Sequence, residues 1–207
     1  MDGNNDLLEY LRRRFLVLSW DNLYHDILET CRKIVESGYK PDCLIAVARG
    51  GWVIARIVSD FLGVGEVASV GVKYYVDIGR TSEKPRLVQG LDGDLRNKRV
   101  LLVDDVADTG RTLNFSKEYL ASLGAAEVRS AVPYRKPWSK FTPDYYHRVV
   151  DKWIVFPYEQ REIIESVVRD CREKYGPGVL ATLKRSLKEA GFDGETLEFA
   201  YSLLDLR

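Results

Sequence analysis

The sequence is poor in the features that mark disulfide-rich, zinc-binding and membrane-spanning proteins. Its three cysteines, Cys31, Cys43 and Cys171, are widely spaced and form no CxxC pair, which argues against a disulfide framework and against a zinc cluster. The longest apolar runs, such as LIAVA at 44–48, are far too short to cross a bilayer. The amino terminus MDGNNDLLEYLRRRF lacks the apolar core and cleavage pattern of a signal peptide. We therefore expect a cytoplasmic protein.

An excess of charge of one sign is also missing. The 31 lysines and arginines balance the 31 aspartates and glutamates, which gives a net charge of zero. No global positive field draws such a chain to nucleic acid or to anionic lipid, so neither a nucleic acid nor a membrane is expected as a partner. Any anion-binding site must therefore be local. The 207 residues, 45% of them hydrophobic, can build one good core and an appendage.

Strand-like and helix-like segments alternate along most of the chain. This alternation predicts an α/β protein with a mainly parallel twisted sheet, flanked by helices on both faces, and ligands of such sheets bind outside the carboxyl ends of the strands. From about residue 159 the pattern changes to three helical segments. We expect one domain over residues 1–160 and a C-terminal helical appendage over 161–207. The expected strands lie at 43–48, 67–76, 98–106, 127–134, 144–150 and 153–156, and the main helices at 19–37, 52–63 and 111–124.

Residues 100–113 read VLLVDDVADTGRTL and place two adjacent carboxylates, Asp104 and Asp105, directly after a run of apolar residues. Two ionised carboxylates at the end of a buried strand repel each other, and burying them without a partner is costly. We therefore expect a cation or a set of hydroxyl donors to face them.

The turn that follows these acids has the composition of an anion-binding loop. Ala107 and Gly110 are small enough for the backbone to curl tightly. The backbone N–H groups, the hydroxyls of Thr109 and Thr112, and the start of the next helix then form a cradle for one phosphate dianion. A sugar phosphate accounts for both features, with its phosphate in the turn, its ring hydroxyls donating to the carboxylates and a metal ion nearby.

A second turn, ARGG at 48–51, follows another expected strand. Its two glycines permit close approach of backbone N–H groups to oxyanions, and Arg49 adds a charge suited to a diphosphate. Taken alone, the turn is also compatible with a plain strand-to-helix connection that needs glycine.

The segment 72–99 is long and polar for a connection in a compact domain, which favours a functional lid over a passive loop. Any one of its cations is also typical of a solvated surface. Lys73, next to a strand end, is the best candidate for a role in closing over a polyanion. The cations of this lid are Lys73, Arg80, Lys84 and Arg86.

The hydrophobic strand, the two acids, the two small or apolar residues and DTGRT together resemble the signature with which type I phosphoribosyltransferases bind phosphoribosyl diphosphate (PRPP). The resemblance covers about residues 19–160 and implies phosphoribosyl transfer with Mg²⁺ as cofactor. It implies that Asp104 and Asp105 hold the ribose hydroxyls and reach the metal only indirectly, mainly through PRPP. The loop implied to wrap the 5-phosphate consists of Ala107, Asp108, Thr109, Gly110, Arg111 and Thr112.

The same resemblance implies roles for the other segments. Asp108 is implied to face the incoming base near its N7 as acid/base catalyst, and Lys73 is the second catalytic candidate, on the family's catalytic loop. Arg49, Gly50 and Gly51 correspond to the family's pyrophosphate loop. That loop often contains a cis peptide that does not precede proline, here to be sought on either side of Arg49.

Residues 133–159, PYRKPWSKFTPDYYHRVVDKWIVFPYE, closely resemble the base-recognition region of the 6-oxopurine enzymes, particularly archaeal ones. With N-terminal residues they are expected to form a small base-recognition hood. Lys136 can donate to the O6 carbonyl of a purine, whereas the amino group of adenine would be repelled there. Trp153 supplies a flat face for stacking, and the Ile154 backbone can read the opposite edge of the base.

Other functions remain open at this point. A non-catalytic PRPP or nucleotide sensor would use the same cradle, although the chain has no separate basic arm for reading DNA. Transfer to adenine or a pyrimidine would leave Lys136 without its carbonyl partner or require different base contacts. Neither His25 nor His147 has a triad partner at a readable spacing, so both are expected to be structural. Members of the family usually assemble as homodimers or homotetramers, and we expect the same here.

Overall fold

The computed structural model describes residues 3–76 and 83–205, and the side chains of residues 6–73 and 85–204. By its contacts the chain divides into two compact units. The larger unit is Tyr24–Asp151, and the smaller unit combines Met1–Leu23 with Lys152–Arg207. The domain boundary expected after residue 160, where the sequence changes to helical segments, stays a prediction.

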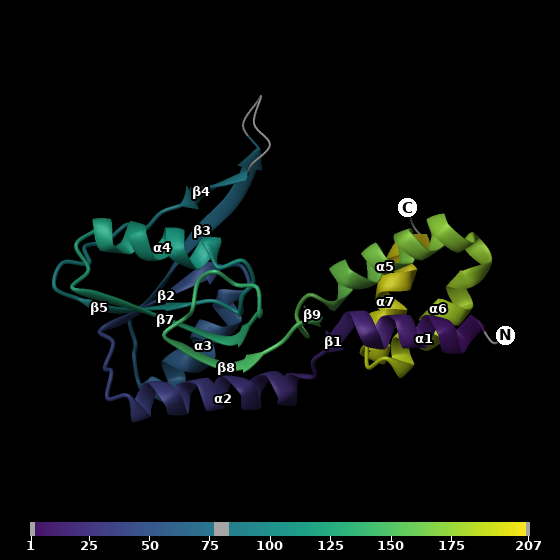
Figure 1. The fold of residues 1–207 in the computed structure, drawn as a ribbon, viewed down its shortest axis with the longest axis horizontal. Helices are drawn as coiled ribbons and strands as arrows, with labels where there is room; N and C mark the ends of the chain where they lie inside the picture. Colours follow the sequence, from purple (N-terminus) through teal and green to yellow (C-terminus); the bar gives the residue numbers. More distant parts are fainter. Residues whose placement is uncertain (1–2, 77–82, 206–207) are drawn as a thin grey trace. The chain divides into compact units, whose positions relative to one another are not determined.

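The larger unit is built on a seven-stranded sheet (Figure 1). Its strand order is β4-β3-β2-β5-β7-β6, with β8 also paired to β7. Among the paired strands of the described residues, only β3 and β4 are antiparallel, which confirms the expected mainly parallel sheet. The strands are β2 (Cys43–Ala48), β3 (Val67–Val76), β4 (Glu83–Gln89), β5 (Arg99–Val103), β6 (Val106–Ala107), β7 (Glu127–Arg135) and β8 (Tyr145–Val149).

Helices cover both faces of this sheet. The side chains of a strand alternate between faces, and those of Cys43, Ile45 and Val47 share one core cluster with Leu113 and Leu120 of α4. Figure 1 shows α4 on one side of the sheet and α2 with α3 on the other. The helices are α2 (Trp20–Glu36), α3 (Gly51–Leu62) and α4 (Arg111–Ser122).

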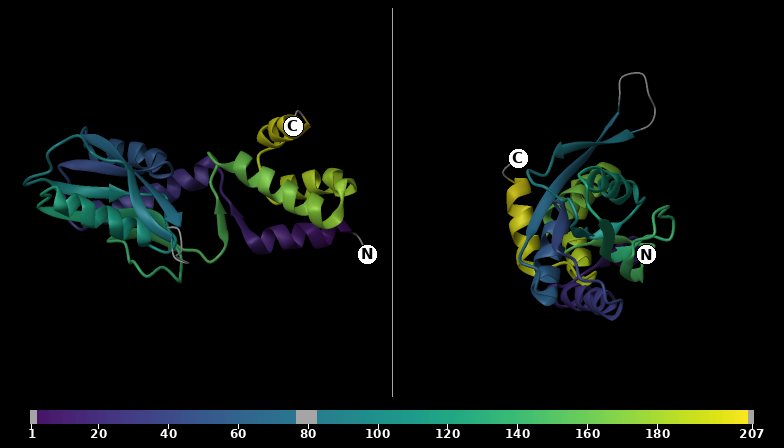
Figure 2. Two further views of the ribbon diagram at one scale, coloured as in Figure 1. Left: turned by 90° about the horizontal axis from the view of Figure 1, so that it is seen from above. Right: turned by 90° about the vertical axis from the view of Figure 1, so that its left-hand side faces the viewer.

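The segment expected to be a polar lid is in part a β-hairpin. β3 continues to Val76, and β4 pairs with it so that Tyr74 lies opposite Pro85. Both strands extend beyond their neighbours in the sheet (Figure 2). The expectation of one long connection over 72–99 is therefore wrong for residues 83–89, which form an edge strand. A proline is tolerated there because an edge strand does not need every N–H group.

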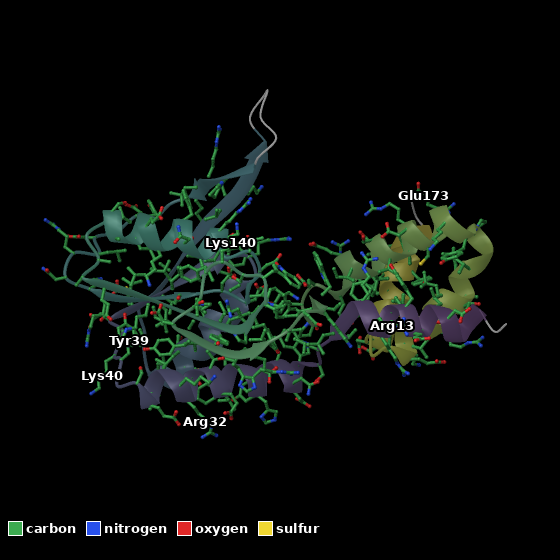
Figure 3. The ribbon with its side chains drawn as sticks, viewed as in Figure 1. Arg13, Arg32, Tyr39, Lys40, Lys140 and Glu173 are labelled. Carbon is green, nitrogen blue, oxygen red and sulfur yellow. The ribbon has the colours of Figure 1, made fainter. Side chains whose placement is uncertain are left out.

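Buried polar contacts fix the helices to the strands. The hydroxyl of Tyr134 in β7 donates to Asp26 of α2 at 2.6 Å, and Arg148 and His147 of β8 lie 3.2 and 3.3 Å from the same carboxylate. Tyr39, which is labelled in Figure 3, lies on the connection between α2 and β2, and its hydroxyl donates to the Val100 carbonyl at 2.9 Å. The structural role expected for His147 agrees with this network.

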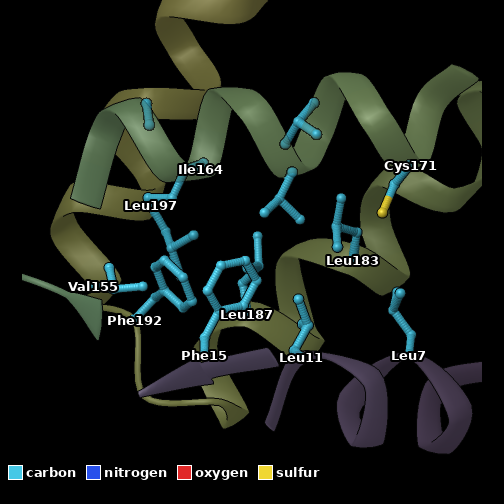
Figure 4. Close-up of a cluster of buried hydrophobic side chains, with 13 residues drawn as sticks. Leu7, Leu11, Phe15, Val155, Ile164, Cys171, Leu183, Leu187, Phe192 and Leu197 are labelled. Carbon is cyan, nitrogen blue, oxygen red and sulfur yellow. The ribbon is translucent and has the colours of Figure 1, made fainter. Parts of the chain in front are cut away.

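The smaller unit has its own hydrophobic core (Figure 4). Leu7, Leu11 and Phe15 from the amino terminus pack against Leu183 and Leu187 of the C-terminal helices. Leu183 and Leu187 of the expected appendage are thus buried against the first helix, whereas Phe199 is 65% exposed. None of the helices in the described part of the chain is long and apolar enough to cross a membrane. The elements are α1 (Gly3–Arg14), β1 (Phe15–Val17), β9 (Trp153–Val155), α5 (Gln160–Tyr175), the 3₁₀ helix η1 (Pro177–Val179), α6 (Leu180–Glu189) and α7 (Gly194–Asp205).

Candidate functional site

Strand register brings the two glycine- and acid-containing turns to one edge of the sheet. β2 and β5 are parallel neighbours, with Ala46 opposite Val103. Arg49 and Asp104 therefore follow these strands at the same carboxyl edge. β3 lies on the other side of β2, with Ala48 opposite Gly71, so Lys73 emerges at this edge as well.

The two adjacent acids differ in their surroundings. Asp104 is buried, and its Oδ1 accepts the backbone N–H of Asp105 at 2.9 Å. Burial, and next to it the charge of Asp105, raise the pKa of Asp104 well above its ordinary value. Asp105 is half-buried. The edge thus holds Asp104, whose ionised form is disfavoured, beside the more accessible Asp105. Hydroxyl donors from a ligand would stabilise the ionised carboxylates.

The ARGG turn packs directly against these acids. The peptide bond between Ala48 and Arg49 is cis, which confirms the expectation of a cis bond beside Arg49. A Cβ atom on Gly50 would lie 1.8 Å from Asp105 Oδ2, and one on Gly51 would lie 2.5 Å from the Val103 carbonyl oxygen. Only glycine allows the backbone this close to the carboxylates.

The turn after the acids encloses a hollow of about 260 Å³, lined by residues 106–113. Gly110 has a φ of +79°, a left-handed conformation that favours glycine. It directly precedes α4 and has no side chain with which to cap that helix, although the Thr109 hydroxyl accepts the Arg111 N–H at 3.4 Å. The N-terminal N–H groups of α4 and its dipole therefore favour an anion in this hollow. This arrangement has the form expected of a phosphate cradle.

The loop that follows β7 packs against the turn at Thr109 and Gly110. A Cβ atom on Gly110 would lie 2.2 Å from the Cβ of Phe141 and 3.0 Å from Ser139 Oγ. The Lys140 N–H donates to the Thr109 carbonyl at 3.3 Å. These contacts restrain the backbone of the cradle at Thr109 and Gly110.

Lys136 lies at the end of β7, beside this cradle. Its side chain is only 6% exposed, and its N–H donates to the Ala107 carbonyl at 3.0 Å. Burial lowers the pKa of Lys136, while the charges of Asp108 and Asp151 oppose that shift. A buried ammonium in this position can donate to a carbonyl oxygen of a bound ligand.

The remaining predicted site residues belong to the smaller unit, to the hairpin, or to the part of the chain that the structure does not describe. Trp153 is 57% exposed and Ile154 is buried, both on β9 of the smaller unit. Lys73 is exposed and is the cross-strand partner of Arg86, which puts two cations on one face of the hairpin. Arg80 and the side chain of Lys84 fall outside the described residues.

Sequence reasoning missed one contact at the site. The indole Nε1–H of Trp138 donates to Asp108 Oδ1 at 2.8 Å, although the residues are 30 positions apart. The only available signal was the position of Trp138, two residues after Lys136 in the base-recognition segment.

Comparison with known proteins agrees with this geometry. The family described as "Phosphoribosyl transferase domain" matches residues 18–161. The xanthine-guanine phosphoribosyltransferase of Chromohalobacter salexigens is 31% identical over 76% of this chain and 92% of its own length.

Two solved structures are also similar. The purine phosphoribosyltransferase of Pyrococcus horikoshii Ot3 is 41% identical, with a TM-score of 0.64 over 70% of this chain and 93% of its own. A hypothetical protein from Neisseria gonorrhoeae, solved with bound ppGpp, is 30% identical, with a TM-score of 0.65 over 70% of this chain and 89% of its own. With its cradle, its paired acids and this similarity, the chain belongs to the phosphoribosyltransferase family.

Proposed function

We propose that this protein transfers the phosphoribosyl group of PRPP to a 6-oxopurine base, hypoxanthine, guanine or xanthine, and releases pyrophosphate, as a step of purine salvage. The observation that carries the proposal is the convergence of the ARGG turn, the acid pair and the phosphate cradle at one sheet edge, with a buried lysine beside them. Xanthine-guanine and purine phosphoribosyltransferases among the similar proteins support it.

In this proposal PRPP spans the edge of the sheet. Its 5-phosphate occupies the hollow at residues 107–112, and its ribose hydroxyls donate to Asp104 and Asp105. Its diphosphate lies against the backbone of Gly50 and Gly51. Lys73 and the hairpin close over it and limit the access of water.

The base is proposed to be read by Lys136 at O6, by stacking on Trp153 and by the backbone of Ile154. A lysine donor prefers the carbonyl of a 6-oxopurine to the amino group of adenine, because two donors facing each other repel. The position of Lys136 supports the first of these contacts, because its backbone N–H donates to the Ala107 carbonyl and so holds the residue beside the cradle.

Mg²⁺ is part of the proposal as the partner of PRPP. In the described residues no group of three or more acidic, histidine or cysteine side chains could hold a metal by itself. The donor set fits a metal bound mainly by the substrate, with Asp104 and Asp105 acting through the ribose hydroxyls. When bound, Mg²⁺ would neutralise charge on the departing diphosphate.

The proposed chemistry breaks the anomeric C–O bond and makes a C–N bond without a covalent intermediate. Holding base and sugar in line supplies about 7–11 kcal/mol of the barrier reduction in well-oriented systems. Asp108 is proposed to exchange the proton at N7 of the base, a contribution of about 10²–10⁴ in rate.

A second candidate is nucleotide sensing by the same site without catalysis. The similar Neisseria gonorrhoeae protein with bound ppGpp is the observation that favours it. In that case the cradle would bind a nucleotide phosphate and no base would be consumed.

A panel of bases tests the two candidates against each other. The protein is incubated with PRPP and Mg²⁺ and with hypoxanthine, guanine, xanthine, adenine, orotate or uracil, and pyrophosphate release is measured. We expect release with at least one 6-oxopurine and its loss when EDTA is added. Silence with every base, together with calorimetric binding of a guanine nucleotide, would favour the sensor.

We propose in addition that the protein is cytoplasmic and works as a homodimer or homotetramer. Exposed aromatic side chains on α2 and α3, Tyr24, Trp52 and Phe61, supply apolar surface for assembly. Light scattering coupled to size-exclusion chromatography measures the mass in solution.

A further inference from the structure

Trp138 contacts both charged side chains that face the proposed base. Its indole N–H donates to Asp108 Oδ1 at 2.8 Å, and the Lys136 ammonium lies 5.5 Å from the centre of its ring. Trp138 is nevertheless 53% exposed, so burial alone does not account for its position. One aromatic side chain thus connects the acid proposed to act at N7 with the cation proposed to bind O6.

The backbone around Trp138 is fixed to the loop that carries Asp108. The Lys136 N–H donates to the Ala107 carbonyl at 3.0 Å, and the Lys140 N–H donates to the Thr109 carbonyl at 3.3 Å. Between them, the Trp138 side chain donates to Asp108 itself. Donors at positions 136, 138 and 140 therefore bind the three successive residues 107, 108 and 109.

A β-turn sets the position of the indole within this loop. The Ser139 N–H donates to the Lys136 carbonyl at 3.1 Å, which closes the turn Lys136–Pro137–Trp138–Ser139. Proline in the second position of such a turn pre-sets φ and lowers the number of alternative conformations. The Arg135 guanidinium donates to the Ser139 carbonyl at 3.1 Å and restrains the same turn. The indole is therefore presented by a restrained backbone rather than by a mobile loop.

We propose that Trp138 is a positioning residue that holds the Asp108 carboxylate through its N–H group and the Lys136 ammonium through its ring face. This inference rests on the proposed function. With Oδ1 bound to the indole, Asp108 is oriented so that Oδ2 can meet the proton at N7. The ring face attracts the ammonium by a cation–π interaction and keeps it on the base side of the loop.

Two replacements separate the two contacts. Trp138→Phe removes the N–H donor and keeps an aromatic face, so kcat should fall about 10- to 100-fold, the cost of one hydrogen bond to a charged group, with the KM for PRPP unchanged. Trp138→Leu also removes the ring face and should raise the KM for the 6-oxopurine in addition. Tyr175→Phe is the control, because it removes the polar hydrogen of an aromatic side chain that is 57% exposed at the end of α5.

A double-mutant cycle distinguishes positioning from a general effect on structure. In the Asp108→Asn background, Trp138→Phe should leave kcat unchanged, since the group that it orients no longer exchanges a proton. Equal losses of kcat in the native and Asp108→Asn backgrounds would overturn the inference, and so would native kcat in Trp138→Phe.

A readout without activity completes the test. In ¹⁵N-labelled protein, the indole N–H resonance that disappears in Trp138→Phe should shift in Asp108→Ala, and an unmoved resonance would contradict the hydrogen bond. If the native protein transfers to no base while this resonance does shift, the proposed function fails and the contact stands. If the native protein is active and Trp138→Phe has the same kcat, only the positioning role fails.

Discussion

Gly50 lies directly against the carboxylate of Asp105, since a methyl group on Gly50 would be 1.8 Å from Asp105 Oδ2. The two residues belong to turns that follow neighbouring parallel strands, 55 positions apart in the sequence. Their contact joins the proposed diphosphate and ribose sites into one surface.

Gly50→Ala should therefore separate the two turns and weaken PRPP binding. Overpacking of this kind typically costs about 1–3 kcal/mol, and the displaced carboxylate would lose its alignment with the ribose. Calorimetry with PRPP measures the affinity and urea denaturation measures the stability. Gly65→Ala is the matched control, because nothing lies within 4 Å of the added methyl group. Equal PRPP affinity in the two variants would contradict the proposed site.

Asp104→Asn should stabilise the free protein at neutral pH and lower its affinity for PRPP. The pKa of Asp104 is raised in the folded state, so the folded protein binds a proton more tightly than the unfolded chain. The stability of the native protein then falls as pH rises from the ordinary value of 3.8 through the raised pKa, and the asparagine variant escapes this loss. Thermal unfolding between pH 3 and pH 8 measures it. A variant less stable than the native protein across that whole range would refute the assignment.

Asp108→Asn should slow turnover and leave PRPP affinity unchanged. The amide keeps the shape of the side chain but cannot exchange the proton at N7, so kcat should fall by about 10²–10⁴. Steady-state kinetics and PRPP calorimetry give the two quantities. Asp92→Asn, at another exposed acid of the larger unit, is the control. A native kcat in Asp108→Asn would exclude the acid/base role.

Lys136→Met should raise the KM for a 6-oxopurine without affecting PRPP. A hydrogen bond from a charged donor contributes about 1.5–3 kcal/mol, and methionine removes the donor with little change in volume. Lys40→Met is the control, because Lys40 is exposed on the connection between α2 and β2 (Figure 3). An unchanged KM for guanine, hypoxanthine and xanthine would overturn the role of Lys136 at O6.

Strands that coincide with a local run of apolar residues were predictable from the sequence. The apolar run at 43–48 is a strand with those bounds, and β3 covers the expected 67–76. β4 was not predicted, because its residues are polar and include Pro85, and only pairing with β3 makes them a strand. The expected strand at 98–106 ends at Val103, where the acid pair begins, and resumes only as the short β6.

The site was predictable where one segment supplies several groups and not where distant segments meet. The acid pair and the cradle are contiguous in sequence, and chemistry alone indicates a sugar phosphate. The hydrogen bond from Trp138 to Asp108 depends on the pairing of β6 with β7, and no local signal specifies that register. In the same way, the sequence predicted the C-terminal helices, whereas their packing on Leu7 and Leu11 depends on tertiary structure that no local pattern specifies.

Competition between purine bases distinguishes transfer to 6-oxopurines from transfer to adenine. The native protein is given PRPP, Mg²⁺ and equal amounts of hypoxanthine, guanine, xanthine and adenine, and the nucleotides formed are identified by mass spectrometry. We expect nucleoside 5′-monophosphates of one or more 6-oxopurines, with no adenosine monophosphate. Adenosine monophosphate as the main product, or no nucleotide at all, would contradict it.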